Sequence, residues 1–187
     1  GWCGWGPGVR AVVVVVVGGD GTVNEALNGM LGPVGEDTPE AADLPALAVI
    51  PTGSANVFTR ALGFPPDPVA ATAMLASLIR ADLRRTICLG TWNERWFAVN
   101  AGFGMDADVV ARVDEARTLG FAATPLRYLA VCLLVWTRAQ LRPPRIDVTA
   151  TAPDGRTLSL QRVPLFVASN TNPWTFLGPL PVVTNPR

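Results

Sequence analysis

The sequence predicts an α/β fold: a three-layer N-terminal domain over residues 1–84, followed by a β-rich, sandwich-like domain over residues 85–187. A buried strand followed by a small-residue turn and a helix occurs twice before residue 84, which is the pattern of an α/β layer. Short strands separated by turn signals dominate afterwards. The first strand opens near the N-terminus and the last one ends in a Pro-rich stretch. We therefore expect a fragment whose fold is incomplete at both ends.

The composition excludes several classes of function. All 15 basic residues are Arg, they balance 15 acidic residues, and histidine is absent. Without histidine, Ser-His-Asp catalysis, Cys-His catalysis and His-ligated metal sites are excluded. Without lysine, a Walker-type phosphate loop is excluded too. A net charge of zero gives no electrostatic basis for binding nucleic acid. The three isolated cysteines favour a reducing compartment over a disulfide framework.

The N-terminal elements follow one another in a regular order. The valine-rich run over 9–17 ends in two glycines and is typical of a parallel strand buried on both faces. Apolar residues at helical spacing predict a helix over 22–31, which a Gly-Pro pair ends. A second strand is predicted over 46–50, and its turn leads into a short helix that extends to Leu62. An Ala- and Leu-rich helix is predicted over 68–83.

The later elements are mostly short strands. A hairpin is expected from 85–90 and 96–102, because the turn-forming segment TWNER separates two apolar stretches. Two helices and then three strands in meander order should follow, over 106–117, 125–141, 145–152, 156–162 and 164–169. Residues 178–187 are expected to form a Pro-rich loop.

The most specific pattern is GGDGTVNE at residues 18–25, directly after the first strand. Glycines at a strand end let main-chain N–H groups approach phosphate oxygens, and the following helix adds unpaired N–H groups and the positive end of its dipole. An acidic residue is unusual there, and Asp20 makes sense if it binds Mg²⁺ or accepts a proton from an attacking hydroxyl. The alternative is a tight turn with a capping box, in which Glu25 reaches back to the Thr22 amide. The full octapeptide favours the phosphate loop.

A second small-residue turn, PTGSAN at residues 51–56, also lies between a strand and a helix. By itself it favours simple capping of the helix by Ser54. Neighbouring parallel strands, however, bring both turns to one edge of the sheet, where ligands bind in open α/β folds. Two helix N-termini converging there would form a polyphosphate site. Such a joint site requires that residues 18–22 and 52–56 lie side by side.

These motifs resemble a known family. GGDGTVNEALNGM, AVIPTGSANVFTRALG and FAVNAGFGMD are similar to blocks of the diacylglycerol kinase catalytic domain family, which includes sphingosine kinases and bacterial lipid kinases. The similarity covers residues 12–174, and the PTGSANVF form resembles actinobacterial members. Val57 stands where one version of the second block has Asp, and an initial N-P-x-S/G loop and a later D-G-x-L/E motif are absent. The chain resembles a truncated member, which we expect to be inactive alone.

The resemblance implies an ATP-dependent kinase that uses Mg²⁺ and transfers the γ-phosphoryl group to the hydroxyl of diacylglycerol or a related lipid. Asp20 would be the catalytic or metal-linked carboxylate, and Asp106 is a second metal candidate that could equally cap a helix. Asn56 would brace its turn, and Arg60 would replace the missing lysine. The residues implied in nucleotide binding are Gly18, Gly19, Asp20, Gly21, Thr22, Asn24, Glu25, Thr52, Gly53, Ser54 and Asn56.

The resemblance also implies partners and a location. A lipid kinase would meet a diacylglycerol-like substrate through transient contact with a membrane surface, as a cytoplasmic protein peripheral to the inner membrane face. Trp174 and Phe176 are candidates for contact with acyl chains, although scattered aromatic residues more often belong to a core. Asn100, Gly102 and Gly104 of the third block are weaker site candidates. A homodimer is compatible with the sequence.

Two rival interpretations stay open. Another kinase with a GGDGT turn, such as an NAD kinase-like or phosphofructokinase-like enzyme, would share the first motif; the pairs Asn24-Glu25 and Asn28-Gly29 favour the lipid branch. A nucleotide-binding fragment without turnover would share both turns, because the later acidic motif is missing. A panel of acceptors separates the first rival, and ATP binding without transfer would identify the second.

Overall fold

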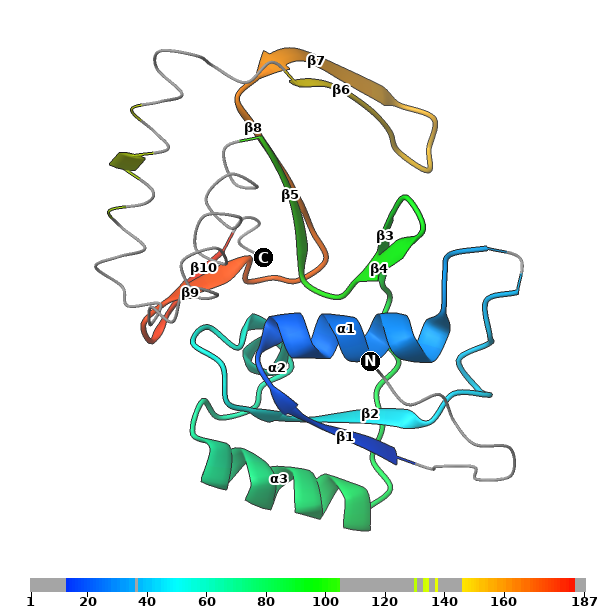
Figure 1. Ribbon diagram of the computed structural model, residues 1–187, viewed down its shortest axis with the longest axis vertical. Helices are drawn as coiled ribbons and strands as arrows, with labels where there is room; N and C mark the ends of the chain where they lie inside the picture. The colour runs from blue at the N-terminus through cyan, green and yellow to red at the C-terminus, as the bar shows by residue number, and fades with distance from the viewer. Residues whose placement is uncertain are drawn as a thin grey trace. The chain divides into compact units, whose positions relative to one another are not determined.

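The computed structural model describes residues 13–35, 37–104, 130, 133, 134, 137 and 146–183. The chain divides into two compact units, Gly1–Asn100 with Ser169–Arg187, and Ala101–Ala168. Its class is mixed α/β, with a β-α-β arrangement first and a β-rich part later (Figure 1). The helix predicted over 106–117 lies outside the described residues, as does most of the helix predicted over 125–141.

The first unit is built on two parallel strands, β1 (Val13–Gly18) and β2 (Ala46–Pro51). They pair in step, from Val13 opposite Ala46 to Gly18 opposite Pro51, so both strands end at the same level. This matched ending puts the turns that follow them at one edge of the sheet.

Helix α1 (Asp20–Leu31) follows β1, and helices α2 (Val57–Ala61) and α3 (Pro68–Arg80) follow β2. Figure 1 shows α1 and α3 on opposite sides of the β1–β2 pair. The N-terminus of α3 is capped locally, because the Asp67 carboxylate accepts a hydrogen bond of 2.8 Å from the Ala70 amide and Pro68 opens the helix.

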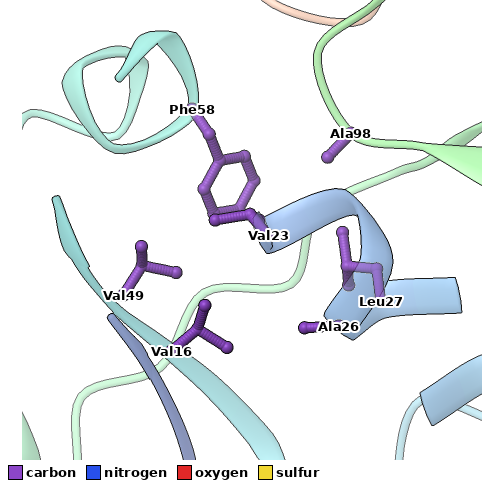
Figure 2. Packing of buried hydrophobic residues seen from close by; sticks show 7 residues of the cluster. All are labelled: Val16, Val23, Ala26, Leu27, Val49, Phe58 and Ala98. Carbon is purple, nitrogen blue, oxygen red and sulfur yellow. The ribbon is translucent and has the colours of Figure 1, made fainter. Parts of the chain in front are cut away.

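The main core of this unit lies between α1 and the strands, and Figure 2 shows its packing. Its buried side chains come from β1, β2, α1, α2 and the segment before β5; they are Val16, Val23, Ala26, Leu27, Val49, Phe58 and Ala98. On α3, Ala71 and Leu75 are buried, and this helix packs on β2. The strands and helices that carry the two glycine turns are therefore held by a packed hydrophobic core.

The prediction that β1 is buried on both faces is wrong. Val16 is 4% exposed on the α1 side, whereas Val15 and Val17 are 50% and 60% exposed. A run of valines has the same appearance whether one or both faces are covered, because no polar residue marks the open face. In the described residues α3 covers β2 and leaves these two valines accessible.

Helix α1 begins at Asp20, two positions earlier than the start predicted at residue 22, and its N-cap is Gly19 without a side-chain cap. The capping box, which was the alternative interpretation of this motif, does not form. The Glu25 carboxylate pairs instead with Arg95. The Thr22 side chain packs over Gly18, because a Cβ added at Gly18 would lie 2.6 Å from the Thr22 Cβ.

The hairpin predicted after residue 84 forms later than expected, from β3 (Gly90–Trp92) and β4 (Arg95–Phe97). Asn28 of α1 holds it: its side-chain NH₂ donates to the Trp96 carbonyl and its oxygen accepts from the Trp96 amide, both at 2.9 Å. Because this hairpin packs on α1, it belongs to the first compact unit. The division of the whole protein into domains at residue 84 stays a prediction.

The remaining strands pair in twos. A hairpin of β6 (Ile146–Thr151) and β7 (Thr157–Val163) closes around a Pro-Asp-Gly turn at residues 153–155. There the Arg156 amide and guanidinium both bond Asp154 and lower the pKa of its carboxyl. The predicted meander is incomplete, because β8 (Leu165–Ser169) pairs with β5 (Asn100–Gly104). Sandwich-like packing of this part stays a prediction.

The prediction of a loop over 178–187 is also wrong for its first half. A hairpin forms from β9 (Thr175–Leu177) and β10 (Leu180–Val182), with Gly178 at φ 60° in the turn. The Trp174 amide donates to the Val182 carbonyl at 3.0 Å and closes its base. The part of the chain that the structure describes contains no helix long and apolar enough to cross a bilayer.

We predict that Val16→Ala lowers the free energy of unfolding by roughly 1–3 kcal/mol, since it removes buried methyl groups and leaves a cavity against α1. Val15→Ala, at the neighbouring half-exposed position, is the matched control and should change it by less than about 0.5 kcal/mol. Urea unfolding of the full-length gene product, followed by tryptophan fluorescence, measures both. Equal losses would contradict the assignment of the two faces.

Candidate phosphate-binding site

The turns after β1 and β2 are in direct contact. The Thr52 amide donates to the Gly18 carbonyl at 3.1 Å. A Cβ added at Gly53 would lie 2.6 Å from the Gly19 Cα, and one added at Gly19 would lie 3.0 Å from the Gly53 Cα. Main chain thus packs on main chain with no room for a side chain between. The side-by-side arrangement on which the sequence argument depends is present.

Asn56 shapes the second turn. Its backbone is left-handed, at φ 50° and ψ 44°, a region that Asn tolerates better than most residues. Its buried side chain accepts from the Gly53 amide at 2.9 Å and donates to the Gly53 carbonyl at 2.8 Å. These two bonds close the turn, which is the bracing that the family resemblance implied. Ser54 is not the N-cap of α2; Asn56 occupies that position and makes no side-chain capping bond.

Asp20 connects the two turns. One carboxylate oxygen accepts from the Val57 amide at 3.0 Å and the other accepts from the Phe58 amide at 2.9 Å. These amides belong to the first two residues of α2, so a residue of the first turn caps the helix that follows the second. Sequence reasoning missed this contact. An acidic residue inside a glycine turn is unusual and indicates that its carboxylate has a specific partner. The sequence does not reveal that partner, because it lies far away in the chain.

The N-termini of α1 and α2 converge, as the sequence predicted, but Asp20 occupies the first two amides of α2, so within this pair it is α1 that is open to a ligand. In α1 the first intrahelical bond runs from the Val23 amide to the Gly19 carbonyl at 3.1 Å, so the amides of the three preceding residues lie outside the helical ladder. Gly21 and Thr22 are exposed, and a Cβ added at Gly21 would meet nothing within 4 Å. This end of α1 is suited to an anion.

The other predicted ligand residues divide into two groups. Thr52, Gly53 and Ser54 are exposed beside the first turn. Glu25, in contrast, lies against the hairpin, where its half-exposed side chain pairs with Arg95. The structure therefore brings together residues 18–22 with 52–56 and directs Glu25 elsewhere.

Asn24 is half-buried, and its carbonyl accepts from the Asn28 side chain at 2.8 Å. Arg60, chosen as the substitute for the missing lysine, holds the β9–β10 hairpin. Its guanidinium lies 3.6 Å above the Phe176 ring centroid and donates to the Gly178 carbonyl at 2.8 Å. Because the arginine covers one face of this ring, Phe176 is less open to an acyl chain than its sequence context indicated.

The third block has structural contacts. The Asn100 side chain donates to the Trp174 carbonyl at 3.0 Å and accepts from the Ser169 hydroxyl at 2.7 Å. Gly104 has φ 75°, and an added Cβ would lie 2.5 Å from the Pro164 carbonyl oxygen, so only glycine fits there. Asp106 lies outside the described residues.

A magnesium site does not follow from the residues that the structure describes. Among them, no group of three or more His, Cys, Asp or Glu side chains is placed to hold a metal ion. Asp20 is the only acidic residue of the paired turns, and both its oxygens accept main-chain amides. The groups of the turns that stay available for a ligand are main-chain N–H groups, which suit an anion better than a cation.

A parallel β-α-β unit with two packed glycine turns and one open helix N-terminus has the architecture that is typical of phosphate-binding α/β proteins. Residues 8–88 match the family described as diacylglycerol kinase catalytic domain. This part of the chain therefore matches the family that the motifs indicated.

Curated relatives agree with this match. The chain is 36% identical over 92 residues to a diacylglycerol kinase of Bacillus subtilis strain 168, an alignment that covers 49% of this chain and 27% of the relative. It is 36% identical over 112 residues to a probable lipid kinase, YegS-like, of Pseudomonas aeruginosa strain UCBPP-PA14, covering 59% and 33%.

A solved structure agrees with them. A protein of Bacillus anthracis strain Sterne, assigned as a diacylglycerol kinase, shares 26% identity at a TM-score of 0.57, covering 91% of this chain and 50% of that one. The chain thus spans half of that solved relative and less of the curated ones.

We predict that Gly53→Ala destabilises the protein by roughly 1–3 kcal/mol, because the new methyl group would lie 2.6 Å from the Gly19 Cα. Gly21→Ala is the matched control: its Cβ meets nothing within 4 Å, and alanine favours the helix by up to about 1 kcal/mol. Thermal unfolding compares the two. A Gly53→Ala protein as stable as the control would show that the turns do not pack as described.

Proposed function

We propose that this chain is the nucleotide-binding part of an ATP-dependent lipid kinase that transfers the γ-phosphoryl group to the hydroxyl of diacylglycerol or a related lipid. The observation that carries the proposal is the pair of packed glycine turns beside the open N-terminus of α1. The family of residues 8–88 supports a lipid kinase over the NAD kinase-like rival.

The proposed site binds the triphosphate mainly with main-chain groups. Bound ATP supplies the phosphoryl group, and the amides of Gly21 and Thr22 would hold its phosphate oxygens at the positive end of the α1 dipole. The exposed residues Thr52, Gly53 and Ser54 would border the phosphates from the second turn. Phosphoryl transfer needs positioning and charge stabilisation more than covalent chemistry, so a cradle of rigid N–H groups is appropriate.

Other residues of the two turns would have supporting roles. Gly18, Gly19 and Asn56 would support the cradle by packing rather than by touching the ligand. For Asp20, proton acceptance stays a prediction from the sequence, and its observed contacts favour the different role argued below. Mg²⁺, with the carboxylate of Asp106 as a candidate ligand, would take part in the reaction of the complete protein.

The setting of the reaction is part of the proposal. The acceptor would be a diacylglycerol-like lipid, met during transient contact with the inner membrane face by a cytoplasmic protein. Trp174 and Phe176 remain candidates for lipid contact, and a homodimer remains compatible. Because the chain spans only part of its relatives, these statements concern the complete protein.

We predict that the full-length gene product transfers label from γ-labelled ATP to diacylglycerol in a mixed lipid extract when Mg²⁺ is present. Magnesium-free reactions and NAD as a rival acceptor are the controls. Labelling of NAD would support the NAD kinase-like alternative. ATP binding without labelling of any acceptor would support a non-catalytic nucleotide-binding protein.

We also predict that Gly21→Ala raises the KM for ATP by roughly tenfold, the effect of losing about 1.4 kcal/mol of binding, while leaving the fold intact. Its methyl group would stand in the open space at the α1 N-terminus, where a phosphate is proposed to bind. Gly29→Ala is the control, because a Cβ there also meets nothing within 4 Å but lies two turns further along the helix. Equal KM values would remove the α1 N-terminus from the site.

A further inference from the structure

Asp20 is the only acidic residue among residues 18–22 and 52–56, and its contacts assign it a different task from the one its position in a phosphate loop indicates. We propose that Asp20 is a positioning residue, whose carboxylate holds the N-terminus of α2 and so fixes the second turn against the first. We call the two hydrogen bonds from the α2 amides to the Asp20 carboxylate the clamp. The clamp does not depend on the enzyme's substrate, and only its effect on the kinetics rests on the proposed function.

The geometry of the clamp is complete. The two carboxylate oxygens each accept one main-chain bond, of 3.0 Å from Val57 and 2.9 Å from Phe58. Both donors open α2 and have no partner within that helix. A carboxylate suits such a position, because it accepts strong hydrogen bonds and its negative charge is stabilised at the positive end of the helix.

Helix α2 cannot cap itself. Its N-cap residue, Asn56, is left-handed and uses its side chain on both main-chain groups of Gly53. Val57 and Phe58 are 5% and 6% exposed, so water does not readily replace a lost partner. Removing Asp20 would leave two buried N–H groups unpaired, which is costly. The N-terminus of α2 would then loosen, and with it the turn that Asn56 closes.

The clamp and proton acceptance compete for the same atoms. Each oxygen of Asp20 already accepts an amide, and a proton placed on either oxygen would weaken one of the bonds to α2. A carboxylate that must stay charged to hold the two turns is poorly suited to take a proton in every reaction cycle. Its charge also offsets part of the positive potential of the two helix N-termini, which leaves phosphate binding to the amides of α1.

The test is amide hydrogen exchange in the full-length protein. Asp20→Asn keeps the shape but replaces one acceptor oxygen by an NH₂ group that faces an N–H donor. Exchange at Val57 and Phe58 should become at least roughly tenfold faster, as expected for the loss of a hydrogen bond to a charged group. Asp67→Asn alters a carboxylate that caps α3 in the same way and should leave these two amides unchanged. Unchanged exchange in Asp20→Asn would overturn the clamp.

A second variant and a kinetic readout complete the test. Asp20→Glu keeps the charge but displaces the carboxylate by one methylene, so it should also speed exchange at Val57 and Phe58. With ATP and lipid, a positioning role predicts a raised KM for ATP with kcat largely retained at saturating ATP. A large fall in kcat with unchanged KM and unchanged exchange would instead establish Asp20 as the proton acceptor. If the wild type transfers no phosphate, the proposed function fails while the exchange result still decides the clamp.

Discussion

The contact between Gly19 and Gly53 is the constraint on which the site depends. It exists because β1 and β2 run parallel in step and end at the same level, which brings both turns together. Side chains at these positions would push the main chains apart. The contact gives no strong attraction by itself, so other groups must secure it. Asn56 does so within its own turn, and Asp20 does so from one turn to the other.

This arrangement explains how a chain without lysine or histidine can offer a phosphate site. The binding groups that we propose are main-chain amides at the N-terminus of α1, and they need no side-chain charge. The other end of α1 is held by the hairpin. The Asn28 side chain accepts from the Trp96 amide, and the Trp96 indole N–H donates to the Gly32 carbonyl at the helix C-terminus. A helix anchored at both ends keeps its amides aimed in one direction. Preorganisation of this kind is what phosphoryl transfer requires.

Sequence reasoning succeeded where the signal was local. The valine run, the helical spacing after it and the glycine turns predicted β1, α1, β2 and their order, with boundaries wrong by a few residues. It failed where partners lie far apart in the chain. Glu25 has the spacing of a capping box but pairs with Arg95, and Arg60 follows the second turn but binds the β9–β10 hairpin. A long polar side chain reaches whichever partner the fold brings near, and spacing along one helix does not reveal it.

The sequence by itself determined the class of the fold, the two turns and the family of residues 8–88, because glycine and β-branched patterns act on the backbone directly. The tertiary structure alone decided what Asp20 touches, that Ser54 does not cap α2, and that β1 has one open face. The physical reason is that these properties belong to pairs of segments. Whether an oxygen accepts an amide, or a valine is covered, depends on the element packed against it, and that element is chosen only when the whole unit folds.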